Sequence, residues 1–266
     1  MYDALGFRFR QTCPDQASAA YMAHILSGLE AAPSDGAVEF ALRAPPAGAQ
    51  AGPGPDEVGH VVGTVNLRAI GASAGSLLLH AGAVARRDGG VAVLCGPSGS
   101  GKSTLTATLS SRHAYVTDET VCLTPESLRI TPFRKPLVLK QGVHKALSWL
   151  RPAEGTVPSP LVGDRWYLPP SSLDTAPLPP QPLFPEVAIF PTYLPGEAVK
   201  VEEVAPAHAA YLFGTNSTQR ESIRGGVLRC VAAWPGALGA SGCSTTTLSK
   251  QPTSSRPCGR MQLDQG

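Results

Sequence analysis

The chain has 266 residues and a formal net charge of +2, and this length allows one large domain or a catalytic domain with a small partner. So small a net charge excludes a surface that holds nucleic acid by bulk electrostatics. No stretch approaches the roughly 18 apolar residues of a membrane span, and the chain starts without the apolar core of a signal peptide. The six cysteines show no C-x-x-C pair and no metal-ligand spacing. We therefore expect a cytoplasmic protein with no nucleic-acid and no membrane partner.

Residues 1–57 are expected to form a small module of helix and strand that ends in a linker. Strands are predicted over Leu5–Phe9 and Ala37–Leu42, and apolar residues at helical spacing predict a helix over Ala17–Leu29. Residues 44–57 are rich in Pro, Gly and Ala. Such a segment cannot bury a core, so it is expected to be a surface loop or linker.

A catalytic domain is expected over residues 58–234. It contains two apolar runs, Leu77–Ala85 and Val91–Cys95, separated by Asp88-Gly89-Gly90. A turn of this composition between two strand-like runs is typical of a β-hairpin. His80 lies in the first arm and is expected close to the loop that follows the second arm. The alternative for His80 is an ordinary core or strand-end histidine.

The second arm runs directly into a glycine-rich loop of the Walker A pattern, G-x-x-x-x-G-K-[ST], which we call the P-loop. Its glycines let successive backbone N–H groups point at a polyphosphate, and the positive end of the following helix adds to that field. The alternative is a flexible Gly/Ser loop without a ligand. The expected nucleotide-binding residues are Gly96, Pro97, Ser98, Gly99, Ser100, Gly101, Lys102, Ser103 and Thr104.

Two side chains of the P-loop are expected to act on the nucleotide. Lys102 supplies a mobile positive charge for the β- and γ-phosphates, and the Ser103 hydroxyl is placed to ligate Mg2+. The predicted cofactors are therefore ATP and Mg2+, although the pattern itself leaves the base of the nucleotide open.

An acidic pair, Asp118 and Glu119, follows shortly after the P-loop. A short helix and a strand over Ala114–Thr117 are expected to return the chain, so that Asp118 lies 16 residues after Lys102. A carboxylate at a strand end beside a P-loop can ligate Mg2+ or accept a proton from an attacking hydroxyl. The alternative is a solvated turn.

The remainder of the chain is less distinctive. Arg134, Lys135 and Lys140 either contact phosphate or an acidic substrate, or belong to a solvated basic strand. The Pro-rich segment 152–185 predicts a long surface loop. Helices are expected over Ala205–Phe213 and Ile223–Trp234, and residues 235–266, rich in Ser, Thr and Gly, are expected to be disordered.

The chain resembles the catalytic domain of the HPr serine kinase/phosphorylase superfamily in four features: LHAGAVA, the hairpin, GPSGSGKSTL and TDET. Within that superfamily it is most similar to the HPr kinase-related proteins of bacteria. The resemblance runs over about residues 60 to 233. It implies an α/β P-loop kinase fold akin to phosphoenolpyruvate carboxykinase, with a mixed, largely antiparallel sheet. It also implies roles for the site residues: catalysis by Asp118 as the base at the substrate hydroxyl with Lys102 and His80 at the phosphates, and metal binding by Ser103, Asp118 and Glu119.

The chain departs from this family in three places. Asp118-Glu119 stands where the family usually has two Asp residues. A Glu-Arg-Gly-Leu-Gly-type segment, which serves metal binding and phosphorolysis, is replaced by residues 131–142. Relatives also close with a further strand, so residues 235–266 resemble an eroded C-terminus. HPr itself as substrate and the reverse reaction are therefore not predicted.

The expected function is an ATP-dependent kinase that phosphorylates a serine or similar hydroxyl on a protein or peptide, either alone or as a homo-oligomer. A small-metabolite kinase is one alternative, although such an enzyme normally enters its P-loop from a parallel sheet. A non-catalytic nucleotide-binding regulator is the other alternative, which the altered acidic pair and C-terminus permit.

Overall fold

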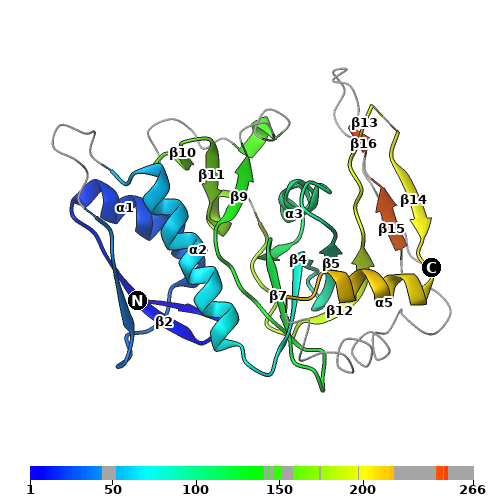
Figure 1. Cartoon of the computed structure of the whole chain (residues 1–266), viewed down its shortest axis with the longest axis horizontal. Coiled ribbons are helices and arrows are strands. Elements are labelled where there is room, and N and C mark those ends of the chain that lie inside the picture. Colours follow the sequence, from blue (N-terminus) through cyan, green and yellow to red (C-terminus); the bar gives the residue numbers. More distant parts are fainter. Residues whose placement is uncertain are drawn as a thin grey trace.

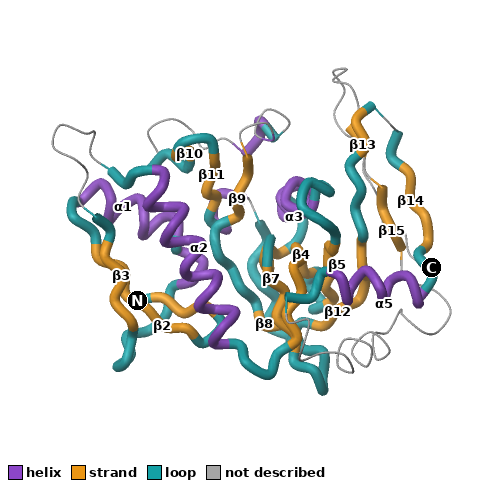
Figure 2. The backbone as a smooth tube through the Cα atoms, viewed as in Figure 1, coloured by secondary structure: helices purple, strands orange, loops and turns teal. Residues whose placement is uncertain are grey.

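The computed structural model describes residues 1–43, 52–140, 143, 147–150, 158–173, 175–196 and 198–218, and the backbone of 244–247 and 249–250. Figure 1 shows an N-terminal module at one end of the molecule and helix α5 (Pro206–Thr215) toward the other. The P-loop helix α3 (Lys102–Ser110) lies between them. Figure 2 shows helices and strands in all parts of the molecule, and the expected α/β class is confirmed. Within these ranges no helix combines the length and hydropathy needed to cross a membrane.

The N-terminal module joins a three-stranded sheet to helix α1 (Gln16–Ile25). Its strands, in sheet order, are β1 (Tyr2–Ala4), β2 (Phe7–Thr12) and β3 (Val38–Ala41). The strand expected over Leu5–Phe9 is confirmed for its last three residues, which lie in β2. It is wrong for Leu5 and Gly6, which form a turn with φ angles of 54° and 90°. The expected helix over Ala17–Leu29 is divided, since α1 ends at Ile25 and a 3-10 turn, η1 (Ser27–Leu29), follows.

Helix α2 (Pro55–Ala72) packs onto this module. Its buried face, which includes Val58, Val61 and Val65, shares one hydrophobic cluster with Phe9 and Met22 of the module. Residues 44–51 of the expected linker lie outside the described residues, but its last residues, 55–57, are helical. The division expected between residues 57 and 58 therefore falls inside α2.

The central sheet is mixed and mostly antiparallel, as expected. Its order is β12-β5-β4-β7-β8, with β6 also paired to β4, and only β12 runs parallel to its neighbour β5 within this described sheet. The strands are β4 (Leu77–Ala85), β5 (Gly90–Cys95), β6 (Ala114–Thr117), β7 (Thr120–Leu123), β8 (Ile130–Thr131) and β12 (Phe184–Ile189).

The predicted β-hairpin is confirmed as β4 and β5. Ala81 pairs with Cys95 and Ala85 with Val91, and the turn closes with Arg86 N–H donating to the Gly90 carbonyl at 2.8 Å. Gly89 takes a φ of 93°, which favours glycine. The P-loop therefore leaves the sheet from an antiparallel strand.

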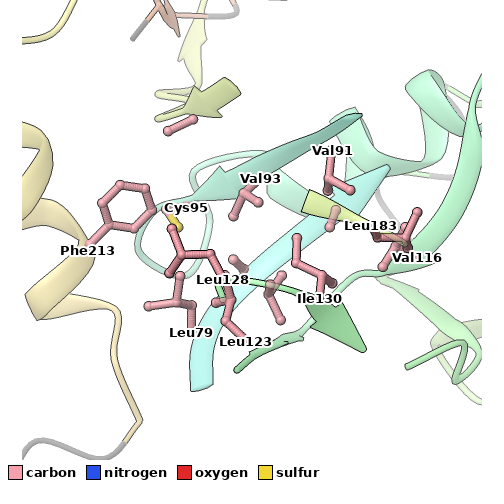
Figure 3. Packing of buried hydrophobic residues seen from close by; sticks show 14 of the residues in the cluster. Leu79, Val91, Val93, Cys95, Val116, Leu123, Leu128, Ile130, Leu183 and Phe213 are labelled. Carbon is pink, nitrogen blue, oxygen red and sulfur yellow. The ribbon is translucent and has the colours of Figure 1, made fainter. Parts of the chain in front are cut away.

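The long strand β4 lies at the centre of the sheet and pairs with three other strands. Its first half pairs with β7 and its second half with β5 and β6, so both edges are used. Such a strand needs apolar residues on both faces, which explains the run LLLHAGAVA. Figure 3 shows the core on one face of the sheet, where Leu79, Val93 and Leu123 pack with Phe213 of α5.

Helix α3 approaches β4 closely at Gly82. A Cβ added there would lie 2.2 Å from Thr106 Oγ1 and 3.8 Å from the Asp118 Cα. The absence of a side chain at Gly82 thus lets the P-loop helix and the acidic pair lie against the same strand.

The Pro-rich segment is not simply the long surface loop that the sequence predicts. Within its described residues it forms β10 (Leu161–Val162), β11 (Arg165–Leu168) and a 3-10 turn, η3 (Pro170–Leu173). Strand β11 pairs antiparallel with β9 (Leu137–Lys140), and its Trp166 and Leu168 are buried. Prolines flank this strand rather than interrupt it, which is why it can pair. Between the two strands lies a further 3-10 turn, η2 (Ser148–Leu150).

The C-terminal part adds strands to the rim of the molecule. Helix α5 confirms the helix expected over Ala205–Phe213, with Pro206 in its first turn. It follows β13 (Leu194–Pro195) and β14 (Lys200–Glu203). The helix expected over 223–234 lies outside the described residues. In the tail expected to be disordered, β15 (Ser244–Thr247) pairs with β14 and β16 (Ser249–Lys250) pairs with β13.

Candidate nucleotide-binding site

The P-loop has the backbone that its glycines predict. Gly99 and Gly101 have φ angles of 84° and 94°, and Gly101 caps the N-terminus of α3. Pro97, Ser98 and Gly99 are exposed, so the tip of the loop is open to solvent. The tip of the loop is thus accessible at the N-terminus of a helix, the location at which such loops bind phosphate. Within the loop the Ser100 N–H donates to the Pro97 carbonyl oxygen at 3.2 Å.

Lys102 is folded back onto its own loop. Its side chain is buried, with 6% exposed, and Nζ donates to the carbonyl oxygens of Gly96 at 2.5 Å and Pro97 at 3.0 Å. Burial lowers the pKa of Lys102, although the charges of Asp118 and Glu119 act in the opposite direction. Among the described residues, the ammonium group donates to these two neutral carbonyls and forms no ion pair, so a phosphate can draw it away without breaking one.

The acidic pair lies at the turn between β6 and β7, where the sequence predicts it. Strand β6 has the predicted bounds and delivers Asp118 and Glu119 at its end. Thr117 Oγ1 accepts hydrogen bonds from the N–H groups of Glu119 at 3.5 Å and Thr120 at 3.4 Å, which closes the turn. Asp118 is 5% exposed and Glu119 39% exposed, so the solvated-turn alternative does not hold for Asp118.

Lys135 has a role that neither alternative predicted from the sequence, because it pairs with both carboxylates of the acidic pair. Its Nζ lies 2.7 Å from Asp118 Oδ1 and 3.0 Å from Glu119 Oε2, and its side chain is only 1% exposed. Burial alone would lower the pKa of Lys135, but the two carboxylates outweigh it and raise that pKa. The same contact holds the pKa of Glu119 below its usual range. Neither a solvated strand nor a free phosphate contact describes Lys135.

Asp118 has further donors. The single proton of the Tyr115 hydroxyl lies between two acceptors, the Lys135 carbonyl oxygen at 2.9 Å and Asp118 Oδ1 at 3.3 Å. The Val138 N–H donates to Asp118 Oδ2 at 3.3 Å. Tyr115 is fully buried, and burial raises its pKa strongly. Both oxygens of Asp118 are therefore held from the interior.

His80 lies on β4 between the P-loop and the acidic pair. It pairs with Thr120 of β7, and its neighbour Ala81 pairs with Cys95 at the start of the P-loop. His80 is half-buried, and burial together with the charge of Lys102 lowers its pKa. The Ala81 N–H donates to the Glu119 carbonyl oxygen at 3.1 Å. The structure thus brings His80, Lys102, Asp118 and Glu119 together, as the sequence predicts.

The segment after β12 also borders the P-loop. The Pro191 carbonyl oxygen would lie 3.5 Å from a Cβ on Gly96, and Tyr193 Cβ would lie 3.9 Å from one on Gly101. Tyr193 is 42% exposed. The sequence predicts no role for this segment, because a single aromatic residue outside a recognisable motif does not indicate a binding site.

The fit to Mg2+ rests on oxygen donors. Ser103, on the first turn of α3, supplies a hydroxyl that is partly exposed, and Mg2+ bound to phosphates needs few protein ligands. Among the described residues no group of three or more His, Cys, Asp and Glu side chains forms a metal cluster. Ser103 fits a nucleotide-bound Mg2+, whereas the carboxylates of Asp118 and Glu119 are already partners of Lys135.

Comparison with known protein families and with curated proteins finds no match for this chain.

Proposed function

We propose that the protein is an ATP-dependent kinase that transfers the γ-phosphoryl group to a serine or similar hydroxyl on a protein or peptide. The observation that carries the proposal is the convergence of P-loop, His80 and acidic pair on one strand, β4. The likeness of these residues to the HPr serine kinase/phosphorylase superfamily adds to it. The antiparallel entry into the P-loop favours this class over a small-metabolite kinase, which normally uses a parallel sheet.

In this proposal catalysis is positioning and charge neutralisation. The P-loop N–H groups hold the phosphates, and Lys102 leaves the Gly96 and Pro97 carbonyls for the β- and γ-phosphates. Ser103 would hold Mg2+ at the phosphates, where the ion supplies further charge neutralisation. His80 is a polar neighbour of the γ-phosphate, and a carboxylate of the acidic pair accepts the proton of the attacking hydroxyl.

One experiment tests the class of function. Purified protein is incubated with γ-labelled ATP, Mg2+ and an extract of its own cells, and label is sought on proteins, peptides and small hydroxyl compounds. Label on a protein or peptide supports the proposal, whereas label on a small compound alone favours a metabolite kinase.

A nucleotide-binding regulator is the second candidate, and the contacts of Lys135 with both carboxylates favour it, since an acidic pair so neutralised is a weak base. ATP binding without transfer to any acceptor would make this the better function.

A further inference from the structure

The two carboxylates of the acidic pair have different surroundings. Asp118 is 5% exposed and accepts from Lys135, Tyr115 and the Val138 N–H. Glu119 is 39% exposed and contacts Lys135 at 3.0 Å. Both carboxylates lie within the electrostatic influence of His80 and Lys102. Of the two side chains, Glu119 is therefore the one that is open to solvent.

A carboxylate held on both oxygens by buried donors is a poor proton acceptor. A proton on Asp118 would remove the charge of the carboxylate with which the buried Lys135 ammonium group makes its shorter contact. Neutralising one partner of such a buried pair is strongly unfavourable. Lys135 also lowers the pKa of Glu119, but Glu119 is 39% exposed and can accept a proton while Lys135 keeps its ion pair with Asp118.

From this we infer that Lys135 divides the roles of the acidic pair: Asp118 is its buried counter-ion, and Glu119 is the carboxylate that meets the acceptor hydroxyl. The inference rests on the proposed kinase function. Lys135 is then a positioning residue, because it acts through Glu119, whose Oε2 it holds at 3.0 Å.

The step balances with the groups already named. As the hydroxyl oxygen forms its bond to the γ-phosphorus, its proton passes to Glu119. The bond from the γ-phosphorus to the oxygen that bridges to the β-phosphate breaks, and ADP leaves with that electron pair. Asp118 and Lys135 keep their charges throughout.

Chemical labelling of the wild-type protein tests the exposure of the pair without any turnover. A water-soluble carbodiimide with glycine ethyl ester is applied to the folded protein, and labelled residues are located by mass spectrometry. We expect label on Glu119 at least tenfold above that on Asp118, with the exposed Glu126 as the positive control. Mg-ATP should protect Glu119 and leave Glu126 unchanged. Equal or greater labelling of Asp118 would overturn the assignment.

Kinetics test the roles, with two nearly isosteric variants. Glu119→Gln should lose roughly 100-fold in kcat with KM for ATP within a few-fold, while Asp118→Asn should lose less than about tenfold. This order is the reverse of the one that the family resemblance implies. If Asp118→Asn loses more kcat than Glu119→Gln, the inference is wrong.

The positioning role of Lys135 needs its own comparison. Lys135→Met should lower kcat with little change in KM, and Lys135→Arg should recover part of the loss because it restores the charge. Equal kcat in wild type and Lys135→Met would overturn the positioning role. If wild type transfers no phosphate at all, the proposed kinase function is wrong. The labelling experiment still shows which of the two carboxylates is accessible to solvent.

Discussion

Two buried lysines, Lys102 of the P-loop and Lys135 beneath the acidic pair, show how surroundings give one residue type opposite behaviour. Carbonyl oxygens hold Lys102, and burial lowers its pKa. Carboxylates hold Lys135, and they raise its pKa despite nearly complete burial. A lysine on neutral acceptors can leave for a ligand, whereas a lysine on charged acceptors is part of the framework.

The largest expected effect is on the framework lysine. Lys135→Met leaves Asp118 and Glu119 as neighbouring carboxylates without their cation, so we expect a loss of about 3–5 kcal/mol in the free energy of unfolding. Lys102→Met loses two hydrogen bonds to carbonyls and should cost less than about 1.5 kcal/mol. The exposed Lys140→Met is the control, and denaturant titration measures all three. Equal losses of unfolding free energy in Lys102→Met and Lys135→Met would show that the two lysines do not differ in their contribution to stability.

The pH dependence of stability sharpens the same comparison. The raised pKa of Lys135 gives stability that is complete below the ordinary lysine pKa and lost only as pH rises through the folded value. The lowered pKa of Glu119 gives stability that is present above the ordinary glutamate pKa and lost as pH falls through the folded value. Neither shift should therefore change wild-type stability between about pH 6 and pH 9. In Lys135→Met the two carboxylates lack their cation, which raises their pKa values, so urea titrations at several pH values should find the variant closest to wild type at the low end of this range. A stability difference that shrinks as the pH rises from about 6 to about 9 would contradict the ion pair.

A smaller effect is expected where α3 meets β4. Gly82→Ala places a methyl group against Thr106 Oγ1 and should cost about 1–3 kcal/mol by overpacking. The matched control is Gly71→Ala in α2, where no atom lies within 4 Å, and which should gain about 0.5–1 kcal/mol. Thermal unfolding measures the stability of both variants. If Gly82→Ala is as stable as Gly71→Ala, the packing of α3 on β4 does not depend on the absence of a side chain at Gly82.

The smallest expected effect on stability is at His80. His80→Gln should change the free energy of unfolding by less than about 1 kcal/mol while lowering turnover, because the side chain is half-buried between the two lysine sites. A large fall in Tm with a proportionate fall in activity would instead make His80 a core histidine.

Local signals predicted one region of the molecule well. The hairpin, the P-loop, α3 and β6 each depend on neighbouring residues, such as the turn at Asp88-Gly89-Gly90 or the glycines of the loop, so their sequence is enough. The position of the acidic pair could also be predicted. A short helix leaves the P-loop and a short strand returns toward it, so Asp118 at the end of that strand must lie near the loop.

Contacts between distant segments could not be predicted in the same way. Lys135 reaches Asp118 because the segment before β9 lies beside β6, where the Phe133 N–H donates to the Val116 carbonyl oxygen at 3.2 Å. In the sequence Lys135 appears as one of several basic residues, directly before a proline. Trp166 and Leu168 are hidden among prolines, whose abundance predicts a loop, yet β9 supplies a partner strand. The turn at Leu5 and Gly6 was missed because alternating residues continue on both sides of it.

The central claim is that the loop from Gly96 to Thr104 binds a nucleoside triphosphate through Lys102. Calorimetric titration with Mg-ATP of wild type and Lys102→Ala, both shown to be folded by circular dichroism, tests it most directly. We expect the affinity of the variant to fall at least tenfold, or more than about 1.4 kcal/mol, while most loop N–H groups still bind. Equal ATP affinity in the two folded proteins would contradict the P-loop assignment.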